Sequence, residues 1–396
     1  MSAVEGNYTV SLRKLLIEGG IWMDFPKEKY GFYFRYFQIS RFVFCLAVWL
    51  LVLWTLVNEG PEFLFKPPAI FIPLGGVLIT STFLILIKSS KLHRLVDQCE
   101  VNLSSYTKSW ELEIVRGDTQ RLNTFINFGK FSFLNFALLY IFLPLIVDGI
   151  RAVMGYEDPY YLPIPLEGYL GPNPSRSLHY YMIILTCDLW FLVAITLTNA
   201  FEGLVLFIVS YNIIELKILK QCVKNLESQT EKFNDDGVQL LPPWDLREII
   251  RYHKKILRLN FQENKCITPA YIMQNLTCTL SIAFIVFMIR QLVGENTMML
   301  FLSVTFVGMV VVMLFMVCFA GEIIQSESLE LFSTLYNIPW YRQSPRVRKD
   351  ILIIMTQLSK PLVLDYKQNV INLPVFMQII NNSYSFFMLM TSVKPA

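Results

Sequence analysis

The feature that most constrains this chain is a series of nearly uncharged apolar stretches, each long enough to cross a lipid bilayer. Crossing a hydrocarbon core of about 30 Å takes roughly 20 residues of α-helix. The stretches cover residues 36–57, 68–87, 131–150, 178–211, 267–291, 297–320 and 370–393. They predict an all-α membrane protein with seven transmembrane helices.

The composition agrees with that prediction. Of 396 residues, 54% are hydrophobic and only 16% are charged, whereas soluble domains carry about 25% charged residues. An ordinary soluble enzyme is thereby excluded. The net charge of +3 is too small to indicate nucleic-acid binding, and the Lys and Arg residues are not gathered into one basic face.

The Lys and Arg residues are distributed unequally between the two sides of the predicted bundle. Cytosolic loops retain these residues because translocating them across a membrane is unfavourable. Of the 34 Lys and Arg residues, 29 fall on the side of the N-terminus. The other side holds Lys66, Arg151, Arg176, Arg290 and Lys394. The N-terminus is therefore predicted to be cytosolic and the C-terminus extracellular.

This topology divides the chain into four parts. Residues 1–35 form a cytosolic N-terminal segment, 36–320 hold spans one to six, 321–369 form a cytosolic helical anchor region, and 370–396 hold the last span with a short extracellular tail.

Amphipathic patterns predict two cytosolic helices, one over 244–260 and one that begins at Ser344-Pro345. The fourth span is also expected to continue beyond the membrane, through Leu216 and Leu219. These helices either form a platform through which subunits associate, or cover one another within a monomer.

The sequence lacks the patterns that accompany catalysis or cofactor binding. No P-loop, dinucleotide fingerprint or CxxC spacing is present, and the three histidines are far apart. Asp188 is interpreted as the one carboxylate near mid-membrane, either functional or bonded to hydroxyls such as that of Thr186. A lone carboxylate without a base partner is no active site, so the sequence predicts no enzyme, no metal and no cofactor.

The last span carries polar side chains along one helix face. Gln378, Asn381 or Asn382, Ser385, Leu389 and Ser392 follow at steps of three and four residues. Polar side chains that face lipid are costly, so this face has to meet water or protein. It is either the wall of a pore shared by several copies, with Leu389 as an apolar constriction, or a set of interhelical hydrogen bonds in a bundle.

Three short segments near the C-terminus point to a family. They are residues 335–341 (LYNIPWY), 360–362 (KPL) and 383–387 (SYSFF). With seven spans, a cytosolic N-terminus and a near-continuous fifth and sixth span, they resemble the insect odorant receptor family. The layout is similar over the whole chain, and the specific motifs are confined to its C-terminal part.

The resemblance implies an odorant-tuning subunit of a ligand-gated, non-selective channel for monovalent and divalent cations. It implies a heterotetramer with the family's shared co-receptor in the plasma membrane of olfactory neuron dendrites, where each last span lines a central pore. By position, Leu389 matches the family's hydrophobic gate, with Ser392 and Val393 beside it and Ser385 one turn earlier.

The resemblance also implies a ligand pocket among spans two to six, in the outer half of the membrane. Such a pocket is mostly apolar and suits a small volatile apolar molecule, with Tyr140, Tyr181 and Thr305 as polar groups. Each expected lining residue alternatively serves ordinary packing. The expected lining is Phe71, Leu74, Leu78, Phe136, Tyr140, Leu143, Tyr181, Leu185, Phe284, Phe287, Met288, Phe301 and Thr305.

Three other classes of protein are alternatives to an odorant-gated channel. A G-protein-coupled receptor also has seven spans, but its N-terminus faces outward. A gustatory-type receptor channel ends in a Thr-Tyr and Gln-Phe pattern, which this chain lacks. A transporter or membrane enzyme favours paired intramembrane carboxylates or an inverted repeat, and neither is found in the sequence.

Overall fold

The computed structural model describes residues 10–21, 27–60, 63–64, 66, 69, 71–156, 169, 177–228, 243–294, 297–366 and 369–393, and nearly all of them are helical. The all-α prediction is confirmed. The helices are α1 (Val10–Glu18), α2 (Lys27–Glu59), α3 (Phe71–Ser104), α4 (Ser109–Val153), α5 (Leu178–Ser228), α6 (Pro243–Cys266), α7 (Thr268–Leu292), α8 (Thr297–Asn337), α9 (Pro345–Leu358) and α10 (Leu373–Val393).

Five helices in the described part of the chain are long and apolar enough to cross a membrane. They include the predicted spans one, three, four, five and six. Helices α3 and α10 overlap the predicted spans over 68–87 and 370–393, but neither helix is among the five. The count of seven spans and the orientation stay predictions.

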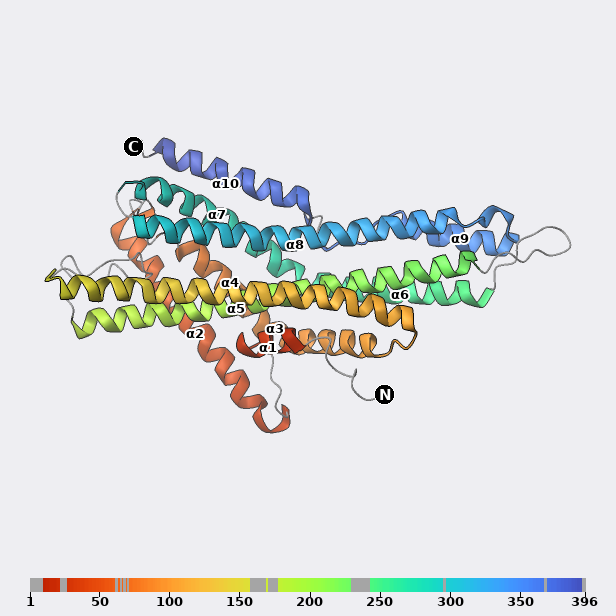
Figure 1. The fold of residues 1–396 in the computed structure, drawn as a ribbon, viewed down its shortest axis with the longest axis horizontal. Helices are drawn as coiled ribbons and strands as arrows, with labels where there is room; N and C mark the ends of the chain where they lie inside the picture. Colours follow the sequence, from red (N-terminus) through yellow and green to blue (C-terminus); the bar gives the residue numbers. More distant parts are fainter. Residues whose placement is uncertain are drawn as a thin grey trace.

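Several helices continue far beyond the predicted spans. Helix α5 runs without interruption through Leu216 and Leu219, as expected, while α3, α4 and α8 extend into the segments between the predicted spans. In Figure 1, α4, α5 and α8 follow the long axis, and α6 and α9 lie at the end away from the C-terminus. We call this end, formed by α6, α9 and the adjoining parts of α3, α4, α5 and α8, the platform.

The platform buries the apolar faces that the amphipathic patterns predict. Leu246, Ile249 and Ile256 of α6 are buried, and so are Ile351 and the other apolar residues on the inner face of α9. Helix α6 packs on α5 and α7, and α9 packs on α8. These faces are therefore covered within the same chain. A short antiparallel pair, β1 (Asp365–Tyr366) with β2 (Asn369–Val370), then leads into α10.

Two carboxylates, Glu215 of α5 and Glu263 of α6, are almost completely buried in the platform. The Tyr211 hydroxyl donates a hydrogen bond to Glu215, and the Asn212 amide donates one to Glu263. Asn102 of α3 donates to the Tyr211 hydroxyl oxygen at 2.9 Å. Burial raises the pKa of Glu263 to about 8, although the Asn212 hydrogen bond opposes the shift. Glu263 is therefore mostly protonated at neutral pH.

Replacing Glu263 by Gln is expected to flatten the pH dependence of stability. The folded chain holds this proton up to about pH 8, whereas the ordinary carboxyl loses it near 4.5. The stabilisation is therefore complete below that ordinary pKa and is lost as the pH rises to about 8, by at most roughly 1.4 kcal/mol per pH unit. An amide has no proton to lose, so Glu263→Gln should melt at a higher temperature than the wild type at pH 8.5.

Melting temperatures of the full chain in detergent at pH 6 and pH 8.5 test this prediction. Glu248→Gln is the matched control, because Glu248 lies on the same helix and is exposed. It should leave the pH dependence unchanged. Identical pH dependence in the wild type and Glu263→Gln would contradict the assignment.

Candidate functional site: a cavity between four helices

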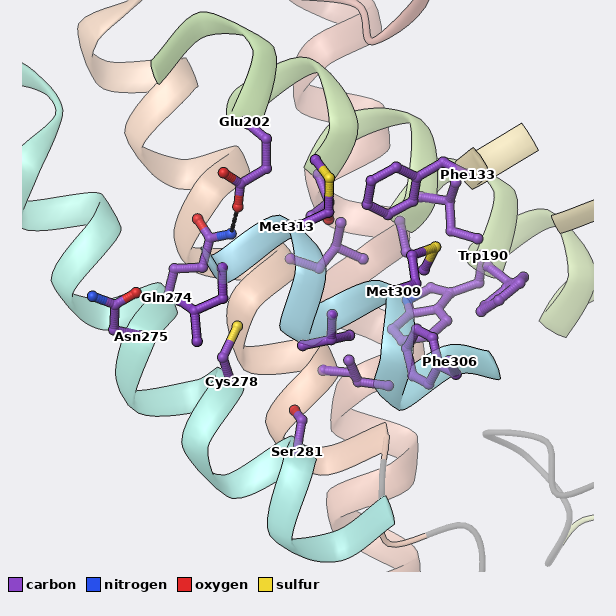
Figure 2. A pocket seen from close by; sticks show the side chains of 18 residues that line it. Phe133, Trp190, Glu202, Gln274, Asn275, Cys278, Ser281, Phe306, Met309 and Met313 are labelled. Atoms are coloured by element: carbon purple, nitrogen blue, oxygen red, sulfur yellow. Dashed lines mark hydrogen bonds between the residues drawn. The ribbon is translucent and has the colours of Figure 1, made fainter. Parts of the chain in front are cut away.

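Helices α3, α5, α7 and α8 enclose a cavity, to which α4 contributes one side chain (Figure 2). It holds about 850 Å³ of space between side chains, its open mouth included. The lining consists of Leu74, Leu78, Phe133, Trp190, Phe191, Ala194, Ile195, Thr198, Glu202, Gln274, Asn275, Cys278, Ser281, Phe306, Met309, Val310, Met313 and Leu314.

Helical periodicity explains why these residues share one space. Side chains three and four positions apart lie on the same helix face. Helices α5, α7 and α8 each present one such face to the cavity. The faces are Phe191, Ala194, Ile195, Thr198 and Glu202 of α5, Gln274, Cys278 and Ser281 of α7, and Phe306, Met309, Val310 and Met313 of α8.

The cavity has an apolar side and a polar side. Figure 2 shows Phe133, Trp190 and Phe306 together on one side, and Glu202 and Gln274 on the other. The Gln274 amide donates a hydrogen bond to Glu202, whose side chain is buried. The aromatic side offers dispersion and apolar burial to a ligand, and the polar side offers hydrogen bonds.

Four buried polar atoms of the lining have no hydrogen-bond partner among the described residues. They are Nε1 of Trp190, Oε2 of Glu202, Oε1 of Gln274 and Oδ1 of Asn275. Leaving a buried polar atom unpaired costs about 1–3 kcal/mol. Nε1 of Trp190 is a donor, and the amide oxygens of Gln274 and Asn275 are acceptors, so a ligand hydroxyl is able to both donate and accept a hydrogen bond here.

The cavity contains Glu202 and not Asp188, which was interpreted as the one carboxylate near mid-membrane. Both residues lie in the predicted fourth span, but only Glu202 lines the cavity. The Thr186 hydroxyl, which was the alternative partner of Asp188, donates instead to the Met182 carbonyl of its own helix at 2.8 Å. Glu202 follows Thr198 by four residues, so the sequence alone places both on one face of the predicted fourth span. This spacing was the signal that could have identified Glu202 as a cavity residue.

A second cavity of about 500 Å³ adjoins the first and shares Leu74, Phe191 and Phe306 with it. The rings of Phe136 and Phe306 are stacked with their centroids 5.2 Å apart, and those of Tyr140 and Phe191 are tilted with their centroids 4.2 Å apart. The remaining lining is Phe71, Ile285, Met299, Leu302 and Ser303. Two of these four aromatic rings, Phe191 and Phe306, therefore contact both cavities.

The residues expected to bind ligand are only partly gathered at these cavities. Five of them line one or both: Phe71, Leu74, Leu78, Phe136 and Tyr140. Of the others, Leu143, Phe284 and Met288 pack in neighbouring hydrophobic clusters, and Phe287 is buried outside both cavities. The rest lie toward the surface: Tyr181, Leu185, Phe301 and Thr305.

The larger cavity lies nearer the platform than the expected pocket. On α5 its lining begins at Trp190 rather than at Tyr181, and on α8 it begins at Phe306 rather than at Phe301. The displacement amounts to between one and three helical turns, at about 5.4 Å per turn. Its lining residues Phe133, Trp190, Met309 and the polar group around Gln274 were not singled out in the sequence. Two amides, Gln274 and Asn275, within an apolar span were an available signal.

Helix α10 lies along α7 and α8 at the end of the chain (Figure 1). Ser383 is buried and donates to the Thr279 carbonyl of α7 at 3.0 Å. On the face predicted to be polar, Leu389 is 59% exposed, and Ser385 and Ser392 are exposed with hydroxyls bonded to their own helix. Val393 belongs to α10, but its side chain lies outside the described part. A single chain thus leaves this face uncovered.

The sequence is similar to those of known odorant receptors. Residues 76–384 match the sequence model of the family described as 7tm Odorant receptor. Odorant receptor 82a of Drosophila melanogaster is 26% identical over 259 residues, which is 65% of this chain and 64% of that protein. Odorant receptor 10 of Aedes albopictus is 24% identical over 241 residues, 59% of this chain and 60% of that protein. The matches thus span just under two thirds of these relatives.

Solved structures share the fold. The insect olfactory receptor OR5 from Machilis hrabei superposes with a TM-score of 0.75 at 15% identity, over 98% of this chain and 100% of that one. Its structure in complex with eugenol gives 0.74 at 14% identity, over 97% and 98%. The arrangement of helices is the one seen in these olfactory receptor structures. The chain belongs to the insect odorant receptor family, as its C-terminal motifs indicated.

Proposed function

We propose that this chain is the odorant-sensing subunit of a ligand-gated, non-selective cation channel. Its ligand is a small volatile molecule with an apolar body and one hydroxyl or carbonyl group, bound in the cavity between α3, α5, α7 and α8. The observation that carries the proposal is the combination of an aromatic and thioether lining with unpartnered polar atoms on Trp190, Gln274 and Asn275.

The chemistry of the lining supports this class of ligand. Apolar burial contributes about 25 cal/mol per Å², which is the main interaction open to a volatile molecule. A single hydrogen bond to an otherwise unpaired buried atom adds selectivity, because an analogue without that group leaves the atom unpaired. The similar receptor OR5 from Machilis hrabei has been solved in complex with eugenol, which supports a small organic ligand.

The packing of α10 supports coupling between the cavity and a pore. The carbonyl that accepts the Ser383 hydrogen bond belongs to Thr279, which follows the cavity residue Cys278 on α7. A ligand that binds one position of α7 better than another shifts the population of that state. Helix α10 packs directly on α7 and would move with it.

The exposed polar face of α10 supports assembly around an axis. One helix is unable to enclose a water path, so several copies are needed, with Leu389 as the apolar constriction that blocks ions by dewetting. We propose that the other subunits are the family's co-receptor, in a heterotetramer of the plasma membrane of olfactory dendrites. The permeating ions are monovalent and divalent cations.

Odorant-evoked current after co-expression with the co-receptor tests the proposal, and Leu389→Ala tests the pore. Removing the constriction is expected to raise the resting leak several-fold, because a wider and less apolar gap holds water. Met388→Ala is the matched control, since Met388 is also exposed but lies about 100° around the helix. An unchanged leak and unchanged gating in Leu389→Ala would show that α10 does not line the pore in this way.

A further inference from the structure

A groove separate from the odorant cavity lies between α4, α5 and α8 at the platform end of the bundle. It holds about 690 Å³, its open side included. Its charged end lies toward the platform and its apolar length toward the membrane. The lining is Asp118, Arg121, Leu122, Phe125, Leu206, Ser210, Ile213, Lys217, Met316, Phe319, Ala320 and Ile323.

On α5 and α8 the groove lies where the inner membrane surface is predicted, whereas its α4 residues precede the predicted third span. The fourth span is predicted to end at residue 211 and the sixth at residue 320, and the groove contains Ser210 and Ala320. Phe125 and Phe319, on its two rims, are 50% and 45% exposed. The apolar part of the groove is therefore open to acyl chains of the inner leaflet.

The charged end carries one cation more than it has anions. Lys217 Nζ lies 2.9 Å from both carboxylate oxygens of Asp118. Arg121 Nη1 lies 3.5 Å from the same carboxylate, but its side chain is 75% exposed. One carboxylate thus faces two cations, and Arg121 is the more distant and the more exposed of the two. A guanidinium in this position matches a phosphate group.

We propose that this groove binds an anionic phospholipid of the inner leaflet. One acyl chain lies along Phe125, Leu206 and Phe319, and the lipid phosphate accepts hydrogen bonds from the Arg121 guanidinium. Anionic lipids are concentrated in the cytoplasmic leaflet, and each nearby Lys or Arg strengthens their attraction.

The position of the groove gives the lipid a route to α10. Phe319 stacks on Phe315, with centroids 5.7 Å apart, and Phe315 contacts Phe376 of α10 edge to face at 5.5 Å. A bound acyl chain restrains Phe319 and hence α8 against α10. This regulatory consequence rests on the proposed function, whereas the binding of the lipid does not.

Photo-crosslinking tests the binding. The full-length chain, alone or with its co-receptor, is placed in nanodiscs that contain phosphatidylserine or phosphatidylcholine with a diazirine on the acyl chain, and the labelled peptides are identified by mass spectrometry. We expect phosphatidylserine to label the peptides around Phe125 and Phe319 more strongly than phosphatidylcholine. Arg121→Gln should lower that labelling about fivefold, the effect of one cation on anionic lipid.

Two further variants sharpen the test. Arg116→Gln removes the same charge from an exposed position of α4 outside the groove, and it should leave the labelling unchanged. Ala320→Trp fills the groove and should abolish labelling by both lipids. If Ala320→Trp does not fold, Arg121→Gln still tests the proposal. Arg121 is largely exposed, so its replacement leaves the fold intact.

Several results would overturn the proposal. These are equal labelling by the two lipids with no effect of Arg121→Gln, the absence of label at both rims, or a crosslink that places another protein chain in the groove. Displacement of the lipid by millimolar glycerophosphoserine would also overturn it, because a free phosphate compound would then suffice. The crosslinking experiment measures no ionic current. A negative result would therefore contradict lipid binding without contradicting the proposed channel function.

Discussion

Replacing Gly321 by Ala is expected to displace the start of α10 and to abolish the response of the receptor. A Cβ atom at residue 321 of α8 would lie 2.1 Å from the Ile371 carbonyl oxygen. That oxygen belongs to the backbone, so no side-chain rotation relieves the collision. Overpacking of this kind costs typically 1–3 kcal/mol, and here it acts where the chain enters the proposed pore helix.

The segment before α10 has little freedom to move away from Gly321. Ile371 donates its N–H to the Leu364 carbonyl at 3.0 Å, and Leu362 donates to the Ser328 hydroxyl of α8 at 2.9 Å. Asn264 of α6 donates to the Val363 carbonyl at 3.1 Å. Because these bonds connect the segment to both α8 and α6, a shift at Ile371 breaks several of them together.

Gly308→Ala is the matched control for this prediction. It lies on the same helix, and a Cβ at Gly308 meets nothing within 4 Å. The melting temperature of the full chain in detergent should fall in Gly321→Ala by roughly 1 °C for each kcal/mol lost, and should not fall in Gly308→Ala. Odorant-evoked current should be lost only in the first variant. Wild-type melting and current in Gly321→Ala would refute the close approach.

Filling the cavity with Ala194→Phe is expected to remove odorant sensitivity while the receptor still reaches the cell surface. Ala194 of α5 lines the cavity and is half-buried, so a phenyl ring occupies space that the ligand needs. Losing about 100 Å² of apolar contact costs the ligand about 2.5 kcal/mol, or roughly 70-fold in affinity. Concentration–response curves of the evoked current measure this loss.

Thr196→Phe separates a filled cavity from a damaged helix. Thr196 lies two residues further along α5 on an exposed face, where its hydroxyl bonds to the Leu192 carbonyl of the same helix at 2.8 Å. It introduces the same ring without entering the cavity, and the response should stay near that of the wild type. Surface labelling of both variants controls for expression. Equal sensitivity in Ala194→Phe and the wild type would place the ligand elsewhere.

Local patterns in the sequence predicted several elements correctly. Ser344-Pro345 predicted the start of α9, which begins at Pro345 with Ser344 as its N-cap residue. The apolar repeat through Leu216 and Leu219 predicted the extension of α5. These elements depend on caps and on helical periodicity, which involve residues close together in the chain.

The depth of the cavity was not predictable in the same way. It depends on where α5, α7 and α8 approach one another, and neighbours in space such as Glu202 and Gln274 are far apart in the sequence. The platform was underestimated for a related reason. The segments between predicted spans carry enough charge to resemble loops, yet they are helical because their apolar faces are buried by other helices.

The sequence by itself determined that this chain is a helical membrane protein of the odorant receptor family, because span length, charge distribution and the C-terminal motifs are properties of contiguous residues. Only the tertiary structure decided which faces of α3, α5, α7 and α8 share a cavity, that Glu202 rather than Asp188 faces it, and that Gly321 admits the backbone of Ile371. Those features depend on the distances between helices, which side-chain packing determines only once the whole bundle has formed.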